Sequence, residues 1–284
     1  MLGFNACLIA NKNSWEREDL SRILASIDSW LPEVENKPSL PAVEIPVRIS
    51  GENPPWGDED TVRLALPDGH QQKPTIELLN KAGITLDDYP SGTGNRRPGI
   101  SLDRVSVKVI RPQDMPLQVA NGNFDLAITG KDWLLEHLYQ FPSSPVDELL
   151  DLKFARVRIV AVVSRELEVD DIQGLRRLYA ERAETVRVAS EYVNIADKCA
   201  RDNRLGVYRV IPTWGATEAF LPEDADMLIE NTETGRTIAG HNLKIIETLF
   251  ESTGRLIGNR ESISSAEKGG RIQNIIRILK AAVQ

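Results

Sequence analysis

The 284-residue chain has few of the residues that define several protein classes. Its two cysteines, Cys7 and Cys199, are too few for a disulfide scaffold and lack metal-site spacing, so we expect free thiols in a reducing compartment. The three histidines, His70, His137 and His241, share no metal-ligand spacing. Because the chain has no run of about 18 apolar residues and no basic leader, we expect a cytoplasmic protein without a membrane segment.

Positive charge is also scarce. The chain has 34 Lys+Arg against 42 Asp+Glu, a net charge of −8, and its basic residues form no block. This balance argues against nucleic acid as a partner, because a polyanion is repelled unless positive charge is gathered locally. A phosphate ligand would have to be bound by backbone amides, a few placed cations or a divalent metal.

The first 60 residues differ from the rest of the chain. They hold 6 of the 16 prolines and 11 acidic residues against 5 basic ones. We expect an acidic, proline-rich extension with one amphipathic helix from Ser14 to Leu31, where Pro32 ends it, and one strand at Val43–Ile49.

From Val62 onwards, short apolar strands alternate with amphipathic helices, a pattern typical of an α/β protein with a mostly parallel sheet. We expect strands at residues 62–66, 105–110, 124–129, 156–163, 185–189, 207–211 and 227–230. We expect helices or helical turns at residues 75–81, 114–121, from 132, at 195–200, 217–221, 237–250 and in the tail, 262–284.

The most informative segment is Met227–Ile238. A buried strand ends in Glu230, and a loop with threonines and Gly235 follows and leads into a helix. Such a loop can bind an anion through its backbone N–H groups and hydroxyls, and the carboxylates beside it suit sugar hydroxyls or a metal. The alternative is that Thr234 or Thr237 only caps the helix.

Other segments occur with this one in a fixed order along the chain: Val62–Gly69, Arg111–Pro116, Asp125–Asp132, Tyr192–Asn194, Glu233–Thr237 and Glu251–Ile257. Together they resemble the signature segments of ATP phosphoribosyltransferase, the first enzyme of histidine biosynthesis. The resemblance covers about residues 62–262, and several ordered motifs are far more specific than any one alone.

The resemblance implies an α/β fold of two lobes like type II periplasmic binding proteins, with the active site in the cleft. Residues 61–155 and 248–284 would form lobe I, and residues 156–247 lobe II. The implied reaction transfers the 5-phosphoribosyl group from phosphoribosyl pyrophosphate to N1 of ATP and releases pyrophosphate, with Mg²⁺ on the pyrophosphate. Such a reaction needs no protein nucleophile, which agrees with the lack of a Cys/His or Ser/His pair.

The resemblance also implies roles for individual residues, while the metal ligands stay open. The catalytic residues would be Glu230 and Glu233. Phosphoribosyl pyrophosphate would be bound by Thr232, Thr234, Gly235, Arg236 and Thr237. ATP in the cleft would meet Arg111, Thr129, Gly130, Lys131 and Glu218.

Several of these residues have a structural alternative. Arg111 could instead form a surface ion pair, whereas Thr129 to Lys131 lie where a strand end would face the cleft. Asp125 is better explained by a structural role. Arg96 and Arg97 could reach a triphosphate or lie in a solvated loop.

The chain departs from the family pattern at a few positions. Asp68-Gly69-His70 stands where the family has a basic residue and Gly-Arg, which weakens a phosphate contact or moves it to Lys73. Gly215-Ala216-Thr217-Glu218 replaces Gly-Ser-Val-Glu. Glu230 replaces an aspartate, so the side chain is longer by one methylene.

Two other functions remain open: a non-catalytic ligand-binding or regulatory module on the same bilobed fold, and a phosphoribosyltransferase for another base. We expect a homo-oligomer. Only 22 residues follow Ser262, too few for the histidine-binding domain of longer family members. Feedback control would then need a second polypeptide, a regulatory subunit resembling histidyl-tRNA synthetase.

Overall fold

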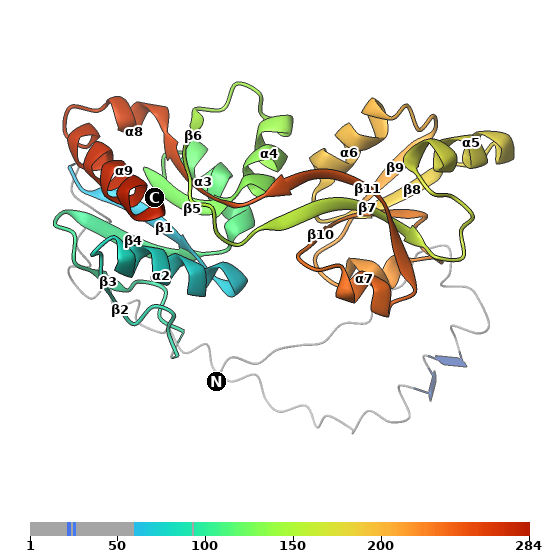
Figure 1. Cartoon of the computed structure of the whole chain (residues 1–284), viewed down its shortest axis with the longest axis horizontal. Coiled ribbons are helices and arrows are strands. Elements are labelled where there is room, and N and C mark those ends of the chain that lie inside the picture. The colour runs from blue at the N-terminus through green and yellow to red at the C-terminus, as the bar shows by residue number, and fades with distance from the viewer. Residues whose placement is uncertain (1–21, 24, 27–59, 93) are drawn as a thin grey trace. The chain divides into compact units, whose positions relative to one another are not determined.

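The computed structural model describes residues 22–23, 25–26, 60–92 and 94–284 (Figure 1). The chain divides into two units, Met1–Glu52 and Asn53–Gln284. The four described residues of the first unit are helical. The rest of the helix predicted from Ser14 to Leu31, the strand predicted at Val43–Ile49 and Cys7 lie outside the described residues.

The second unit contains two five-stranded sheets, and we call each sheet with its helices a lobe. The sheet of lobe I has the order β4-β1-β5-β12-β6. Its strands are β1 (Val62–Pro67), β4 (Val105–Ile110), β5 (Leu126–Gly130), β6 (Val146–Asp151) and β12 (Gly254–Asn259). Its helices are α2 (Gln72–Lys81), α3 (Met115–Ala120), α4 (Lys131–Gln140), α8 (Arg260–Ser264) and α9 (Gly269–Val283). Short 3₁₀ turns, Gly69–Gln71 and Pro112–Asp114, follow β1 and β4.

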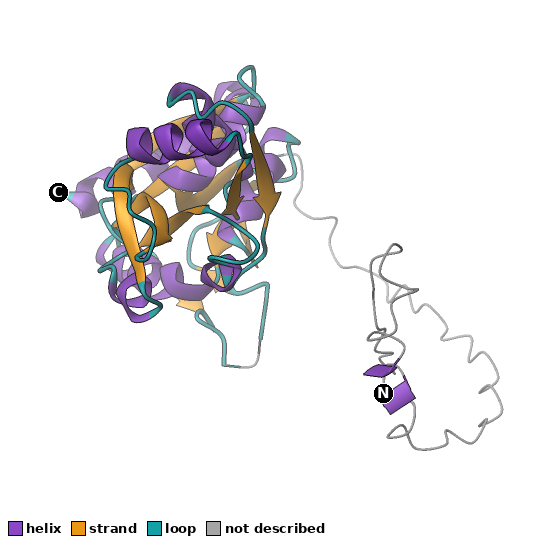
Figure 2. Ribbon diagram, turned by 90° about the vertical axis from the view of Figure 1, so that its right-hand side faces the viewer, coloured by secondary structure: helices purple, strands orange, loops and turns teal. Residues whose placement is uncertain are grey.

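The central strands β1 and β5 of this sheet are buried on both faces, which explains why they are almost continuously apolar. Leu64 and Ile128 pack with α2 and α9 on one face, whereas Ala65 and Ala127 pack with α3 and α4 on the other. Helices accordingly lie on both sides of the strands (Figure 2).

The sheet of lobe II has the order β11-β7-β10-β8-β9. Its strands are β7 (Val157–Ser164), β8 (Val186–Ser190), β9 (Tyr208–Pro212), β10 (Met227–Thr232) and β11 (Leu243–Ser252). Its helices are α5 (Ile172–Arg182), α6 (Val193–Asp202) and α7 (Arg236–Gly240), with a 3₁₀ turn at Thr217–Phe220. Two short strands outside both sheets, β2 (Leu86–Asp87) and β3 (Gly99–Ile100), pair with each other.

The chain passes between the two sheets twice, once from β6 to β7 and once from β11 to β12. The long strands β7 and β11 pair antiparallel and run together towards lobe I (Figure 1). Lys153 and Ala155 in the first connection have left-handed backbone conformations, with φ of 61° and 48°. At the second connection, a Cβ on Gly254 would come within 2.6 Å of the Phe154 ring, so only glycine lets the two connections approach this closely.

The two-lobed α/β class predicted from the sequence is confirmed, and most predicted strands and helices of residues 62–284 are present. The sheets are not mostly parallel, however. In each of them two neighbouring pairs are parallel and two are antiparallel. Every antiparallel pair of the two sheets contains β7 or β12, the strands that enter their sheet from the other lobe.

The helix predicted from Thr237 to Phe250 is wrong. Helix α7 ends at Gly240, and Asn242 then adopts a left-handed conformation with φ of 57°. The following segment, β11, pairs with β7 along its length. Backbone pairing with β7 therefore outweighs a local pattern that fits a helix equally well.

Smaller differences concern other elements. The sequence analysis did not predict the strands β2, β3, β6 and β12 or the helix α5, and the Asp114 side chain makes no capping hydrogen bond to α3. The Asp114 carboxylate instead accepts a hydrogen bond from Nε of Arg111 at 3.0 Å. The thiol of Cys199 is free, as predicted, and it is buried. Among the helices of the described residues, none has the length and apolar character needed to cross a bilayer.

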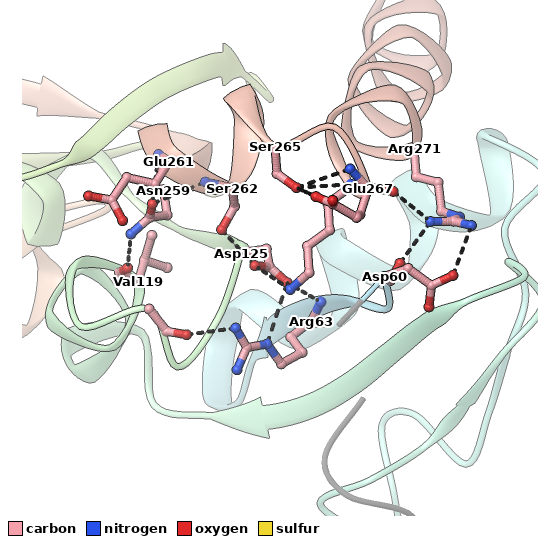
Figure 3. Close-up of polar contacts among 12 residues, drawn as sticks. Asp60, Arg63, Val119, Asp125, Asn259, Glu261, Ser262, Ser265, Glu267 and Arg271 are labelled. Atoms are coloured by element: carbon pink, nitrogen blue, oxygen red, sulfur yellow. Dashed lines mark hydrogen bonds and ion pairs between the residues drawn. The ribbon is translucent and has the colours of Figure 1, made fainter. Parts of the chain in front are cut away.

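Asp125 lies at the amino end of β5 and has a structural environment (Figure 3). Its carboxylate is fully buried and accepts hydrogen bonds from the Ser262 hydroxyl at 2.6 Å, the Arg63 amide at 2.7 Å and the Lys268 ammonium at 3.1 Å. Burial alone would raise the pKa of Asp125, but these donors outweigh it and lower the pKa. The cluster thus ties the segment before α9 to the sheet.

We expect Lys268→Met to lower the free energy of unfolding by about 2–4 kcal/mol at pH 7, because it removes a partner of a buried charge. Urea unfolding measures this loss. Lys280→Met, on the exposed face of α9, is the control and should change stability by less than about 0.5 kcal/mol. Equal stability of the two variants would show that Ser262 and Arg63 alone satisfy Asp125.

Candidate functional site

The loop between β10 and α7 is built around a tight turn. Gly235 has φ of 76°, and its amide donates a hydrogen bond to Oγ1 of Thr232 at 2.9 Å. The Thr232 side chain is buried and thereby holds the turn closed. The backbone amides of Thr237 and Ile238, in the first turn of α7, make no backbone hydrogen bond within the described residues.

This loop forms one wall of a cavity of about 340 Å³, which we call the loop cavity. Carboxylates and hydroxyls dominate its polar lining: Glu191, Glu218, Glu230 and Glu233 with Thr217, Thr232, Thr234 and Thr237. No lysine or arginine is among the residues of the described chain that line it. Of the predicted loop residues, Gly235 and Arg236 are outside the lining, and Arg236 is exposed. The cavity thus combines strong negative charge with many hydrogen-bonding groups.

The neighbouring carboxylates of the loop cavity affect the pKa of Glu230. Burial, together with the charges of Glu191 and Glu218, raises its pKa from 4.5 to about 7, although the Asn231 amide donates to its carboxylate at 3.0 Å. Burial also raises the pKa of Glu191. A ligand that brings positive charge or hydrogen-bond donors to these carboxylates would relieve this penalty.

A second cavity of about 430 Å³, the cleft cavity, lies between the lobes. Lobe I contributes Asp68–Gln71, Arg111–Gln113, Asp132 and Trp133; the first connection contributes Ala155; lobe II contributes Val157, Glu191, Tyr192 and Asn231. Glu191 and Asn231 line both cavities, so the two cavities adjoin at the carboxyl ends of β8 and β10. Ligands in the two cavities would therefore meet at these two residues.

The residues predicted for the ATP cleft have different surroundings. Arg111 lines the cleft cavity and pairs with Asp114, and Glu218 lines the loop cavity. Thr129, Gly130 and Lys131 line neither cavity.

The contacts of these last three residues explain their positions. The buried hydroxyl of Thr129 donates to the Pro112 carbonyl at 2.8 Å. A side chain on Gly130 would collide with the Asp132 carboxylate, and the Lys131 ammonium lies 5.8 Å from the centre of the Phe250 ring. Their roles towards ATP stay a prediction.

Three residues near the cavities were not predicted from the sequence. Glu191 directly follows β8, the strand that pairs parallel with β10, and an acidic residue at a strand end is the signal that pointed to Glu230. Gln71 lines the cleft cavity, and its buried Oε1 has no hydrogen-bond partner in the described chain. The guanidinium of Arg158 lies 3.9 Å from where a Gly235 Cβ would stand, so a cation adjoins the loop. No local pattern marks Gln71 or Arg158.

The described residues contain no group of three His, Cys, Asp or Glu side chains arranged to hold a metal ion. Mg²⁺ commonly needs fewer protein ligands, because it binds one or two carboxylates together with substrate phosphates and water. The loop cavity, with its carboxylates and no cation in its lining, fits a metal ion that arrives with a phosphorylated ligand.

The fold and the two adjoining cavities define a two-lobed α/β protein with a polar, carboxylate-rich site at its cleft. Residues 111–281 match the profile of the ATP phosphoribosyltransferase (HisG) family. The chain belongs to the ATP phosphoribosyltransferase family.

Individual relatives agree with this assignment. The chain is 34% identical over 224 residues to the ATP phosphoribosyltransferase of Prosthecochloris aestuarii, covering 78% of this chain and 71% of that protein. It is 34% identical over 226 residues to the enzyme of Chlorobaculum parvum, covering 79% and 72%. A chain of the ATP phosphoribosyl transferase (HisG:HisZ) complex from Thermotoga maritima has a similar fold, with a TM-score of 0.63 at 19% identity, covering 78% of this chain and 98% of that one.

Proposed function

We propose that the loop cavity binds phosphoribosyl pyrophosphate and that the cleft cavity binds ATP. The chain would then carry out the reaction of its family, transfer of the 5-phosphoribosyl group to N1 of ATP, which is the first step of histidine biosynthesis. The observation that carries the proposal is that the two cavities adjoin at Glu191 and Asn231. Two substrates on either side of this contact would have their reacting atoms next to each other.

In this arrangement the loop would hold the sugar phosphate. The hydroxyls of Thr234 and Thr237 and the amides of Thr237 and Ile238 are available as donors to phosphate oxygens. The carboxylates of Glu230 and Glu233 would accept hydrogen bonds from the ribose hydroxyls. Ionised Glu230 and Glu191 would also stabilise the positive charge that develops on the ribose as pyrophosphate leaves.

Magnesium, when bound, would neutralise the pyrophosphate leaving group. The chain's contribution to holding it would be Glu230 or Glu233 in the loop cavity, with the remaining ligands from phosphate oxygens and water. Such a metal also accounts for how polyanionic substrates could occupy a cavity whose lining has four carboxylates and no cation.

A regulatory partner is a further part of this proposal. The similar fold from Thermotoga maritima belongs to a HisG:HisZ complex. We infer that this chain also assembles with copies of itself and with a regulatory subunit that resembles histidyl-tRNA synthetase.

The test of the function mixes the full chain with ATP, phosphoribosyl pyrophosphate and Mg²⁺. We expect an absorbance rise near the adenine band as the N1-substituted product forms, and no rise when a chelator removes the metal. GTP and free adenine in place of ATP test for another acceptor base. Binding of the substrates without any product would instead support a non-catalytic ligand-binding module.

A further inference from the structure

A chain of hydrogen bonds crosses from lobe I to lobe II beside the cleft cavity. The Tyr192 hydroxyl, at the start of α6, donates to Oδ2 of Asp132 in α4 at 2.7 Å. Nδ2 of Asn231, in β10, donates to the Tyr192 oxygen at 3.0 Å. The same Nδ2 of the Asn231 side chain also donates to Oε1 of Glu230, at 3.3 Å. The bonds therefore connect a lobe I helix to the carboxylate that we place at the ribose.

Asp132 and Tyr192 are held in place by further contacts. The Asp132 carboxylate also accepts a hydrogen bond from the Ser252 hydroxyl at 2.6 Å, and the Asp132 amide donates back to the Ser252 oxygen at 3.0 Å. Asp132, Tyr192 and Ser252 are all buried, at 4%, 1% and 1% exposure. The Tyr192 ring packs against Trp133, with the ring centres 4.3 Å apart. Buried polar groups with every partner satisfied hold one defined geometry.

The Tyr192 hydroxyl keeps its proton and can therefore donate a hydrogen bond in this position. Burial and the neighbouring charges of Asp132 and Glu230 raise the pKa of its hydroxyl well above the usual value, so the proton stays on the oxygen. The hydroxyl can then donate to Asp132 and accept from Asn231 at the same time.

A second contact between the same two helices is independent of Tyr192. The Glu136 carboxylate of α4 accepts hydrogen bonds from the amides of Asn194 and Ile195, in the first turn of α6, at 2.7 and 2.9 Å. Loss of the Tyr192 hydroxyl would therefore leave α4 and α6 packed together. What it would release is the side chain of Asn231, which together with the Asn231 backbone amide donates to the Glu230 carboxylate.

We propose that Tyr192 is a positioning residue: its hydroxyl bridges Asp132 and Asn231 and so holds Glu230 and the phosphate loop in register with lobe I. The proposal rests on the proposed function, because it assumes one substrate on each side of this contact. An error of about 1 Å in the placement of reacting groups can cost about 100-fold in rate. The bridge would therefore act on the chemical step more than on the binding of either substrate.

The test is Tyr192→Phe, which keeps the ring against Trp133 and removes only the hydroxyl. We expect kcat to fall about 10- to 100-fold, while the affinity for phosphoribosyl pyrophosphate, measured by calorimetry, changes by less than about 5-fold. Tyr179→Phe is the matched control: Tyr179 is also a buried tyrosine of lobe II, but its hydroxyl bonds Asp226 and it lines neither cavity. It should change kcat by less than about 3-fold.

Two outcomes would overturn the proposal: equal kcat in the two variants, or equal losses of affinity and kcat in Tyr192→Phe. Asp132→Asn adds a double-mutant cycle, in which the combined variant should be no slower than the slower single variant. Multiplying effects would show that the two residues act separately.

Amide hydrogen exchange tests the bridge without turnover, so its result stands even if the wild type proves inactive. We expect exchange in the segment from Asn231 to Thr237 to be about 10-fold faster in Tyr192→Phe and unchanged in Tyr179→Phe. Unchanged exchange in both variants would show that the bridge does not hold the loop.

Discussion

We expect Gly235→Val to abolish binding of phosphoribosyl pyrophosphate, with a loss of affinity of at least about 100-fold. Gly235 has φ of 76°, a conformation that costs a residue with a side chain about 1–2 kcal/mol and a β-branched residue more. In the free protein the new Cβ would meet only ordinary contacts, 3.8 Å from Ile245 and 3.9 Å from Arg158. Relief of the strain therefore turns the backbone at this position, and the adjoining amides and threonine hydroxyls move out of the geometry that suits a phosphate. Calorimetry with Mg²⁺ and phosphoribosyl pyrophosphate measures the loss.

The control for backbone strain is Gly206→Val. Gly206 lies in the same lobe with the same φ of 76°, and no atom lies within 4 Å of the position that its Cβ would take. Both variants should lose similar stability in thermal unfolding, and only the Gly235 variant should lose the ligand. Retained affinity in Gly235→Val would mean that the sugar phosphate binds elsewhere.

Glu230→Gln should make the protein more stable and nearly inactive. The amide cannot ionise, so it lacks the charge that we assign to the ribose, and we expect kcat/KM to fall at least about 100-fold. The fold, however, holds the Glu230 carboxylate at a pKa of about 7 against an ordinary value of 4.5, so the charged form is disfavoured in the native state. Removing that charge should raise the free energy of unfolding at pH 8 by about 1–3 kcal/mol.

The sign of the pH dependence follows from the raised pKa. Between pH 4.5 and 7 the folded protein keeps a proton on Glu230 that the unfolded chain releases, so this group's contribution to stability falls as pH rises through that range. The advantage of Glu230→Gln should therefore be full above pH 7 and vanish below about pH 4.5. Urea unfolding across this range tests the expectation, with the exposed Glu223→Gln as control. A variant that is no more stable at pH 8 would show that Glu230 is not penalised in the fold.

The parts of the fold that were predictable from the sequence are those that a single local pattern determines. β1 and β10 are short apolar runs with an abrupt end, and α9 has its apolar residues on one face. β11 was mistaken for a helix because its structure depends on pairing with β7, about 85 residues earlier in the chain. α5 begins where Asp171 accepts a hydrogen bond from the Gly174 amide, a cap that the glycine inside the helix conceals in the sequence.

The same distinction separates the predicted from the missed parts of the site. Glu230, Glu233 and the threonines 232, 234 and 237 of the loop cavity lie within a few residues of one another, so a local motif indicated them. Glu191 lies in the loop cavity only because β8 pairs with β10. Gln71 and Arg158 adjoin the cavities only because the lobes bring distant segments together. The bridge through Tyr192 joins positions 132, 192 and 231. No local pattern predicts that these side chains meet, since they lie on three different elements, α4, the start of α6 and β10.

The two connections between the lobes have a consequence for synthesis of the chain. Strand β12 lies between β5 and β6 in the middle of the lobe I sheet, yet it follows every strand of lobe II in the sequence. A ribosome therefore releases all of lobe II before the central strand of lobe I exists. Lobe II has its five strands together first, whereas β5 and β6 wait with their facing edges unpaired until β12 emerges and α9 covers the sheet. Lobe I, which contains the first strand of the two sheets, is thus the last lobe to be completed.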